Sequence, residues 1–405
     1  MENQKDDSHE QQSKLKLWIS ALLPVILLIV LLLFFLKFGP LGVFKSTIIP
    51  IEKAFIQRVI FSPEHITLEV FNDGPEPITI AQVLVNEAYW QFEMTPSNIL
   101  EPLQRGRINI NYPWLEGDAE VITLISRNGV TFEKEIEAAA ITPTFNWFYF
   151  KTFILLGIYV GVIPVLIGLL WFPFLKMLRL RWYSFLLSLT IGLLVFLGFD
   201  ALSESFELIE SLPQAFNGIG ILIIGFLLAV LTLSAVSYKT QHHAKEKGEN
   251  YQALMWGYLI ALGIGLHNLG EGLAIGSAYA VGEIALGSLL VIGFMVHNVT
   301  EGVAIVVPLT KTVKQIKHFL FHLVMMGILA GAPTIAGTLI GGFAFSAALG
   351  VFFLAIGSGA IFDVSFDILE QMAKGSWLSI FTVTNVLGFL AGLLIMYATG
   401  FLVVG

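Results

Sequence analysis

The sequence predicts an α-helical integral membrane protein, in which a bundle of eight helices follows one anchor helix and an antiparallel β-sandwich domain. First, only 13% of the residues are charged, about half the quarter that soluble domains carry. Second, apolar segments close to the 20 residues needed to span a bilayer recur along the chain. Third, residues 45–142 instead alternate apolar and polar side chains, the period of a strand.

The composition also limits the chemistry. The chain has no Cys, which excludes disulfides, thiolate zinc sites and iron–sulfur clusters. Metal ligands would therefore have to be His, carboxylates, amides or thioethers. The formal net charge of −8 argues against a nucleic-acid partner, which would favour a basic surface.

At the N-terminus, the sequence predicts a polar cytoplasmic tail at 1–16 and a transmembrane anchor at 17–37. The apolar run within the anchor, Leu17 to Phe35, is long enough to cross the hydrocarbon core. A signal peptide is the alternative. The run is longer than a typical signal-peptide core and no small-x-small cleavage site follows it, which favours an uncleaved anchor.

Residues 45–142 predict an antiparallel β-sandwich. Turn formers, including Asn72-Asp73-Gly74-Pro75 and Asn128-Gly129, separate the alternating runs. These runs are 66–71, 78–85, 107–110, 120–126 and 130–138. A cupredoxin is a possible alternative, but His65 and Met94 are too few soft ligands for a blue-copper site. We therefore expect a structural or binding module whose partner is unknown.

Residues 148–405 predict the eight-helix unit. Its expected spans are 148–171, 181–202, 216–238, 252–279, 284–309, 318–342, 346–370 and 378–402.

Charge asymmetry between the loops predicts the topology. Basic residues fall in loops on one side of the membrane, at Lys176, Arg179, Arg181, Lys239, Lys245, Lys247, Lys311, Lys314, Lys317 and Lys374. The alternate loops are expected to carry only acidic residues, namely Asp200, Glu204, Glu207, Glu210 and Glu283. The positive-inside rule makes the first side cytoplasmic. The N-terminus is then cytoplasmic, the β-sandwich and C-terminus are extracytoplasmic, and a plasma-membrane location is expected.

The fourth and fifth helices carry a repeated motif, LHNLGEGLAIG at 266–276 and VHNVTEGVAIV at 296–306. In each copy the His and the Glu are four residues apart and share one helix face. A short connection makes the two helices antiparallel neighbours, which brings the copies to similar depth. The polar side chains that would converge are His267, Asn268, Glu271, His297, Asn298 and Glu301.

Polar residues inside a membrane generally mark function, and this N/O donor set suits Zn²⁺, or Fe²⁺, Mn²⁺ and Cd²⁺ with more oxygen donors. The alternative is a buried hydrogen-bond network of the same side chains. Such a network would need protonated or paired Glu residues, yet these helices contain no Lys or Arg in their cores.

With this doubled motif and eight helices in the expected loop order, residues 148–405 resemble the Zrt/Irt-like (ZIP) family of metal-ion transporters, in particular its prokaryotic branch with HNxxEG in both central helices. The resemblance implies a metal site at His267, Glu271, His297 and Glu301. It also implies a second site at Asn268 and Asn298, bridged by the two Glu residues, and movement of the ions into the cytosol.

Several positions depart from the family pattern. Gly270 and Thr300 stand where a Pro is common, and Thr334 stands where some members have a Glu that completes the second metal site. The resemblance therefore implies one firm metal and a weaker second one. The seventh helix carries Asp363 and Asp367 in place of the family's usual residues, and both are candidates for the ion pathway.

Other candidates lie at the periphery. Asp200, at the expected outer end of the second helix, either helps cations to enter or is simply solvated. His242-His243 lie in the expected loop after the third helix and either are solvated or, as the resemblance to ZIP proteins with His-rich loops implies, handle metal weakly. His318 and His322, at the cytoplasmic start of the sixth helix, are either interfacial or line an exit.

The sequence thus predicts a transporter rather than an enzyme, with zinc as substrate, no permanent cofactor and a possible homodimer. Two alternatives remain. A metal-sensing receptor would use the β-sandwich to signal occupancy. An intramembrane hydrolase would use the same metal, but membrane zinc proteases need HExxH, and Asn268 and Asn298 occupy the place of its Glu.

Overall fold

The computed structural model describes residues 22–23, 26–31, 33–34, 52–136, 138–177, 180–281, 284–310, 318–344, 346–373 and 376–404. It divides into two compact units, Met1–Ile51 and Glu52–Gly405. In the first unit the described residues are helical and their apolar side chains are exposed, as expected of a lipid-facing anchor. The predicted tail at 1–16 and the rest of the predicted anchor at 17–37 lie outside the described residues.

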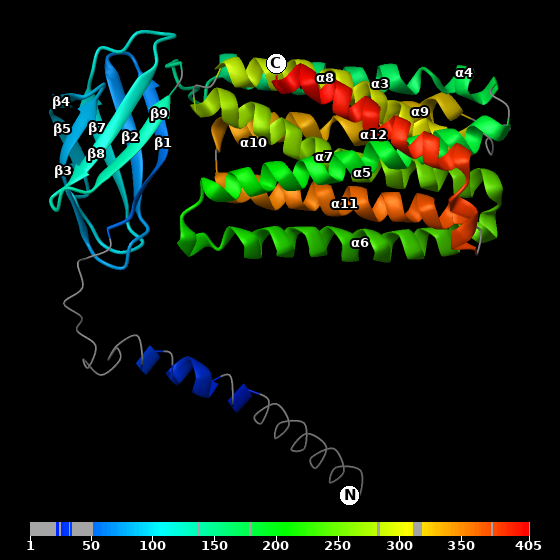
Figure 1. Ribbon diagram of the computed structural model, residues 1–405, viewed down its shortest axis with the longest axis horizontal. Helices are drawn as coiled ribbons and strands as arrows, with labels where there is room; N and C mark the ends of the chain where they lie inside the picture. Colours follow the sequence, from blue (N-terminus) through cyan, green and yellow to red (C-terminus); the bar gives the residue numbers. More distant parts are fainter. Residues whose placement is uncertain are drawn as a thin grey trace, which may run out of the picture. The chain divides into compact units, whose positions relative to one another are not determined.

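The β-domain confirms the antiparallel strands predicted after the anchor helix. Its strands are β1 (Ala54–Ser62), β2 (His65–Asn72), β3 (Ile78–Val85), β4 (Ala88–Trp90), β5 (Phe92–Thr95), β6 (Ile99–Leu100), β7 (Arg105–Asn111), β8 (Glu120–Ser126) and β9 (Thr131–Ile136). All pairings are antiparallel, in a sheet of order β1-β2-β7-β5 and a second of order β4-β3-β8-β9 in which β6 also pairs with β3 (Figure 1). Leu68, Ile80 and Ile122 lie in their common core.

The strands found by alternation are the regular ones. β3 and β8 have the predicted bounds, and along β8 every second side chain is buried. β1 was not among the predicted runs, and its register shifts between Ile56 and Arg58, although β3 was found despite a similar shift between Ile80 and Gln82. A bulge of this kind interrupts the period of two on which the prediction relies.

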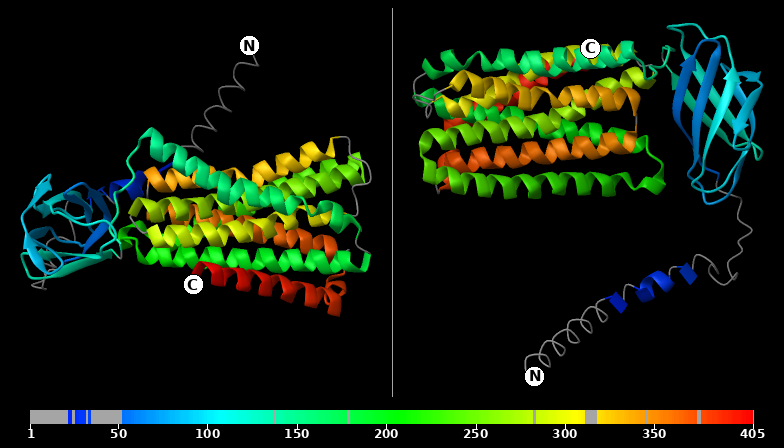
Figure 2. Two further views of the ribbon diagram at one scale, coloured as in Figure 1. Left: turned by 90° about the horizontal axis from the view of Figure 1, so that it is seen from above. Right: turned by 180° about the vertical axis from the view of Figure 1, so that it is seen from behind.

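The helical part begins at Trp147. Its elements are α2 (Trp147–Gly157), η1 (Ile158–Val162), α3 (Ile163–Leu169), α4 (Phe172–Met177), α5 (Leu180–Glu210), η2 (Gln214–Phe216), α6 (Gly218–Lys247), α7 (Glu249–Val281), α8 (Ile284–Val306), η3 (Val307–Leu309), α9 (Phe319–Gly331), α10 (Pro333–Phe343), α11 (Ala347–Ala373), η4 (Trp377–Ile380) and α12 (Val383–Val404). The long helices lie side by side along one direction (Figures 1 and 2).

Among the described residues, seven helical segments are long and apolar enough to cross a membrane, and Val383–Thr399 forms a shorter apolar helix. These are the features of a multi-pass membrane protein. Seven of the eight predicted spans are thereby matched, and the predicted span 378–402 corresponds to the shorter helix.

Two predicted spans are interrupted helices. The first contains a π-helical turn, η1, between α2 and α3. The sixth is divided into α9 and α10, where Pro333 stands at the first position of α10 and cannot donate a backbone hydrogen bond. Both interruptions lie beside the repeated motif, as described below.

Two helices are longer than predicted, which corrects two expectations. α5 continues to Glu210, so Glu204, Glu207 and Glu210 belong to a helix rather than to a loop. α6 continues to Lys247, so His242 and His243 are also helical and not in a loop. Hydropathy marks where the apolar stretch ends, whereas Glu, Leu, Ala and Lys sustain a helix beyond it.

Candidate metal centre

The two motif copies meet between α7 and α8. The Nε2 atom of His297 lies 2.9 Å from Oε1 of Glu271, and Nε2 of His267 lies 3.4 Å from the same oxygen. Glu301 Oε1 is 3.8 Å from His297 Nε2. One ligand atom from each of these four residues lies within 4.8 Å of every other. The structure therefore brings together the four ligands expected from the sequence.

These spacings suit a shared cation. Four donors held at 2.0–2.2 Å around a tetrahedral ion are roughly 3.3–3.6 Å apart. The imidazole rings of His267 and His297 are nearly parallel, with centroids 6.1 Å apart. His297 Nε2 and Glu271 Oε1 are 2.9 Å apart, but neither atom has a hydrogen-bond partner with suitable geometry. Both atoms are available to a third partner between them.

Unsatisfied polar atoms concentrate at this cluster. Fourteen buried side-chain N or O atoms of the described residues have no hydrogen-bond partner, and nine of them belong to the six motif residues and Thr334. Each of the six motif residues is 6% exposed or less. Leaving a buried polar atom unpaired costs about 1–3 kcal/mol, and a charged one costs more. A cation held by one atom from each of His267, Glu271, His297 and Glu301 would satisfy four of these nine atoms at once.

The electrostatics also favour a cation. Glu271 and Glu301 are buried, and α7 and α8 contain no Lys or Arg. Burying a carboxylate without a counter-charge is expensive, so the pair requires protons or a positive ion. Imidazole and carboxylate donors without any thiolate are typical of Zn²⁺ and other first-row divalent ions.

The two asparagines are oriented by the interrupted helices. Nδ2 of Asn298 donates to the carbonyl oxygen of Val160, within η1, at 3.0 Å. Nδ2 of Asn268 donates to the carbonyl oxygen of Ala330, near the break between α9 and α10, at 3.1 Å. Since each amide nitrogen is committed to a backbone carbonyl, each Oδ1 remains a free acceptor. Asn298 also donates to Oε2 of Glu271 at 3.1 Å, which orients that carboxylate.

The Gly that follows each Glu lets the same helices come close. A Cβ on Gly272 would lie 2.3 Å from the backbone oxygen of Thr334 in α10. A Cβ on Gly302 would lie 2.2 Å from the backbone oxygen of Val165 in α3. The motif is therefore used twice in the same way: α7 packs on α9 and α10, and α8 packs on η1 and α3. In each copy the Asn is bonded to the interrupted helix and the Gly permits close contact with it.

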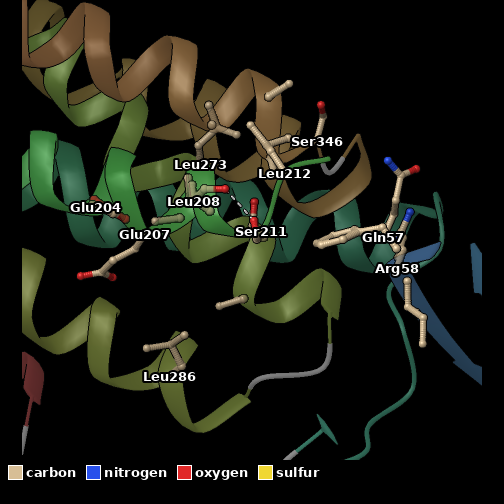
Figure 3. A pocket seen from close by; sticks show the side chains of 18 of the residues that line it. Gln57, Arg58, Glu204, Glu207, Leu208, Ser211, Leu212, Leu273, Leu286 and Ser346 are labelled. Atoms are coloured by element: carbon tan, nitrogen blue, oxygen red, sulfur yellow. Dashed lines mark hydrogen bonds between the residues drawn. The ribbon is translucent and has the colours of Figure 1, made fainter. Parts of the chain in front are cut away.

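A cavity of about 1080 Å³ lies next to the centre (Figure 3). Its wall includes Gly270, which precedes Glu271, and Phe294, whose ring centroid is 5.9 Å from that of His297. The Leu354 side chain packs against Gly270 and lines the same wall. The four clustered His and Glu residues are not part of the cavity wall, whereas their neighbours Gly270 and Phe294 are.

The acidic residues on α5 line this cavity. Asp200, Glu204 and Glu207 are spaced along one side of the helix, and Figure 3 labels the last two. Asp200 was a candidate from the sequence, whereas Glu204 was expected in a loop. The four-residue spacing of Asp200 and Glu204 in a continuous helix would have indicated a shared face.

The remaining candidates are placed differently. Thr334 is buried beside Gly272, and its Oγ1 has no partner. Asp363 and Asp367 of α11 accept hydrogen bonds from Ser234 and Ser237 of α6, away from the four-ligand cluster.

Of the two later histidines, His318 precedes α9 with a left-handed backbone. His322 Nδ1 lies 2.9 Å from the Tyr258 hydroxyl, which connects α9 to α7.

Comparison with known proteins finds no family model and no curated protein that matches this chain.

Proposed function

We propose that this protein is a transporter of divalent transition-metal ions, with Zn²⁺ as the first candidate and Fe²⁺, Mn²⁺ and Cd²⁺ as further ones. The observation that carries the proposal is the buried cluster of His267, Glu271, His297 and Glu301 inside a bundle of membrane-spanning helices. A cluster of this kind at the surface of a soluble protein would suggest a structural metal. Within a membrane, where ionisable side chains are costly, it indicates an ion pathway.

The route of the ion follows from the cavity. A cation attracted by Asp200 and Glu204 would reach the cavity wall at Phe294 and Leu354 and then exchange its water for His and Glu ligands. Release on the other side requires the helices to shift so that the cavity closes and a second exit opens, as in alternating access. Metal binding displaces protons from His and Glu, so uptake should fall as the pH drops.

One ion per centre is the proposed stoichiometry. Two imidazoles and two carboxylates complete the preferred coordination of Zn²⁺. The neighbouring oxygens of Asn268, Asn298 and Thr334 are neutral, so a second ion beside them would be held weakly. The protein provides only ligation and a path, and the metal is its substrate.

The orientation is proposed from the charge asymmetry and from the resemblance to ZIP transporters. The ends of α4 and α6 that carry Lys176 and Lys247 would face the cytosol. The acidic end of α5 and the β-domain would face outward, and ions would move inward across the plasma membrane.

A transport assay tests the proposal. The purified protein in proteoliposomes should admit Zn²⁺ to an encapsulated zinc-sensitive dye, and competition with Fe²⁺, Mn²⁺, Cd²⁺ and Co²⁺ would rank the substrates. Replacing Glu271 and Glu301 together with Ala should abolish this uptake, because no carboxylate would remain in the cluster. Glu210→Gln is the matched control, since Glu210 is exposed at the end of α5 and lies outside the cavity wall.

Equal Zn²⁺ uptake by the double variant and the unmodified protein would rule out this mechanism. Zn²⁺ binding measured by calorimetry in detergent separates loss of the site from loss of movement. A variant that still binds Zn²⁺ as the unmodified protein does would likewise show that the carboxylates are not its ligands.

A further inference from the structure

The β-domain is joined to the connection between α5 and α6 by several specific contacts. The Asp73 carboxylate accepts hydrogen bonds from the backbone N–H groups of Gln214 and Ala215, at 2.8 and 3.1 Å. Lys53 Nζ donates to Oε1 of Gln214 at 3.1 Å. The rings of Phe71 and Phe216 lie 5.7 Å apart. All these contacts converge on the single turn η2.

The turn that presents Asp73 is held in place from within the sandwich. The buried Asn72 side chain accepts from Gly74 N and donates to the carbonyl oxygens of Glu76 and Leu100. The backbone N–H of Asp73 itself donates to Lys53 O at 2.8 Å. The carboxylate is therefore positioned by the fold of the sandwich before any contact with the helices, which lowers the entropic cost of docking.

The opposing turn is equally well defined. Pro213 precedes η2, and Asn217 follows it with a left-handed backbone and accepts from Gly220 N to cap α6. The first N–H groups of a helical turn lack intrahelical partners and need an acceptor. The Asp73 carboxylate, from another part of the chain, is the acceptor for the N–H groups of Gln214 and Ala215, and its negative charge strengthens both hydrogen bonds.

This docking turn borders the cavity that leads to the metal centre. Pro213 and Phe216 contribute to the cavity wall. The β1 residues from Ala54 to Val59 form another part of it, and Figure 3 shows Gln57 and Arg58 there together with Glu204 and Glu207 of α5. The sandwich thus supplies part of the cavity wall, and its contacts with η2 lie at the border of the same cavity.

We propose that the β-sandwich is a docked roof over the entry cavity, held on the α5–α6 turn by Asp73. Small hydrated cations pass beneath it to the acidic face of α5, whereas bulky solutes are kept out. The proposal rests on the proposed function only in naming the ion that passes. The docking itself is a property of the fold and can be tested without transport.

Because the chain has no native Cys, a single introduced Cys reports access to the cavity. Ser203→Cys places a thiol on an exposed position of the cavity wall. A small charged methanethiosulfonate should modify it readily, whereas a maleimide carrying a polyethylene-glycol chain of several kilodaltons should react slowly. Adding Asp73→Ala should raise the rate of the bulky reagent by at least about tenfold and leave the small reagent unchanged. Asp73→Asn, which keeps an oxygen acceptor but loses the charge, should give a smaller rise.

Two controls keep the result interpretable. Glu116→Cys, exposed in the sandwich and outside the cavity wall, should react with both reagents at rates that Asp73→Ala does not alter. Ile108→Cys, in the sandwich core, should stay unreactive in the Asp73→Ala background if the sandwich remains folded. If the Ile108→Cys thiol becomes reactive in the Asp73→Ala background, that variant has unfolded the sandwich. The test then depends on whether Asp73→Asn raises the rate of the bulky reagent at Ser203→Cys.

An independent measurement uses Lys53→Cys with Gln214→Cys, which a short bismaleimide should crosslink within one chain. The proposed roof would be refuted if the bulky reagent modified Ser203→Cys equally fast with and without the Asp73 side chain. Failure of the Lys53–Gln214 pair to crosslink would refute it as well. Loss of zinc transport with normal crosslinking and normal protection would instead refute the proposed function and leave the roof intact.

Discussion

Substituting Gly272 with Ala should weaken metal binding although residue 272 offers no ligand. The new Cβ would lie 2.3 Å from the backbone oxygen of Thr334, whereas ordinary van der Waals contact begins at 3.4 Å. α7 and α10 would therefore have to separate locally by 3.4 − 2.3 = 1.1 Å, because a backbone carbonyl cannot rotate away. The adjacent Glu271 and the bond from Asn268 to Ala330 O would both be displaced.

We expect two measurable effects of this displacement. Overpacking of this kind costs about 1–3 kcal/mol of stability, which should lower the Tm followed by tryptophan fluorescence. Zn²⁺ affinity measured by calorimetry in detergent should fall roughly 10–100-fold, the usual effect of disturbing the groups that orient a metal ligand. The rise in Tm on adding Zn²⁺ should shrink accordingly.

Gly257→Ala is the matched control on the same helix. Its Cβ would meet the side chains of Met326 and Leu309 rather than backbone, and a Met side chain can move aside. If Gly272→Ala bound Zn²⁺ as tightly as Gly257→Ala and melted at the same temperature, close backbone approach would not be what positions the centre.

Two further predictions concern charge. Glu204→Gln should raise the Zn²⁺ concentration needed for half-maximal uptake in proteoliposomes and leave the Zn²⁺ affinity measured by calorimetry nearly unchanged. The reason is that Glu204 lines the cavity and is not among the four clustered residues. An unchanged half-maximal concentration, or an equal change in Glu210→Gln, would contradict this prediction. In the sandwich, burial raises the pKa of Glu120 above its ordinary 4.5. Between pH 4.5 and the raised pKa, the folded state therefore keeps a proton on Glu120 that the unfolded chain has lost. The free energy of unfolding should fall as the pH rises through this range. The Gln side chain of Glu120→Gln can still accept the hydrogen bond from Asn86 but does not titrate. Protection of the β8 amides against hydrogen exchange, corrected for intrinsic rates, should therefore depend less on pH in this variant. An unaltered pH dependence would show that another group is responsible.

The repeated motif illustrates how far sequence reasoning reaches. The spacing of His267 and Glu271, and of His297 and Glu301, depends only on helix geometry, and the structure confirms that these four residues converge. The small Gly residues of the motif indicate close helix packing, and the structure confirms it at Gly272 and Gly302, but the residues that the Asn and Gly of each copy contact could not be read from spacing. Their partners, Val160 and Ala330 for the amides, lie in other helices at points where the regular hydrogen bonding is interrupted.

Apolarity proved a good guide to the spans and a poor guide to the ends of helices. The predicted second span ends at 202, because the residues beyond it are acidic. The helix nevertheless continues to Glu210, with Glu204 and Glu207 facing a cavity. Whether a polar helical residue faces lipid, protein or a cavity depends on its neighbours in space, which hydropathy does not include.

The sequence by itself determined the membrane-spanning character, the separate β-domain and the clustering of two His and two Glu residues, because each follows from composition or from periodicity within single elements. Tertiary structure alone decided the remainder: the pairing of Asp363 with Ser234 and of Asp367 with Ser237, the cavity beside the centre, and the docking of Asp73 on the α5–α6 turn. The physical reason is that these features join residues up to about 140 positions apart through side-chain and backbone contacts, and local periodicity holds no information on contacts at that separation.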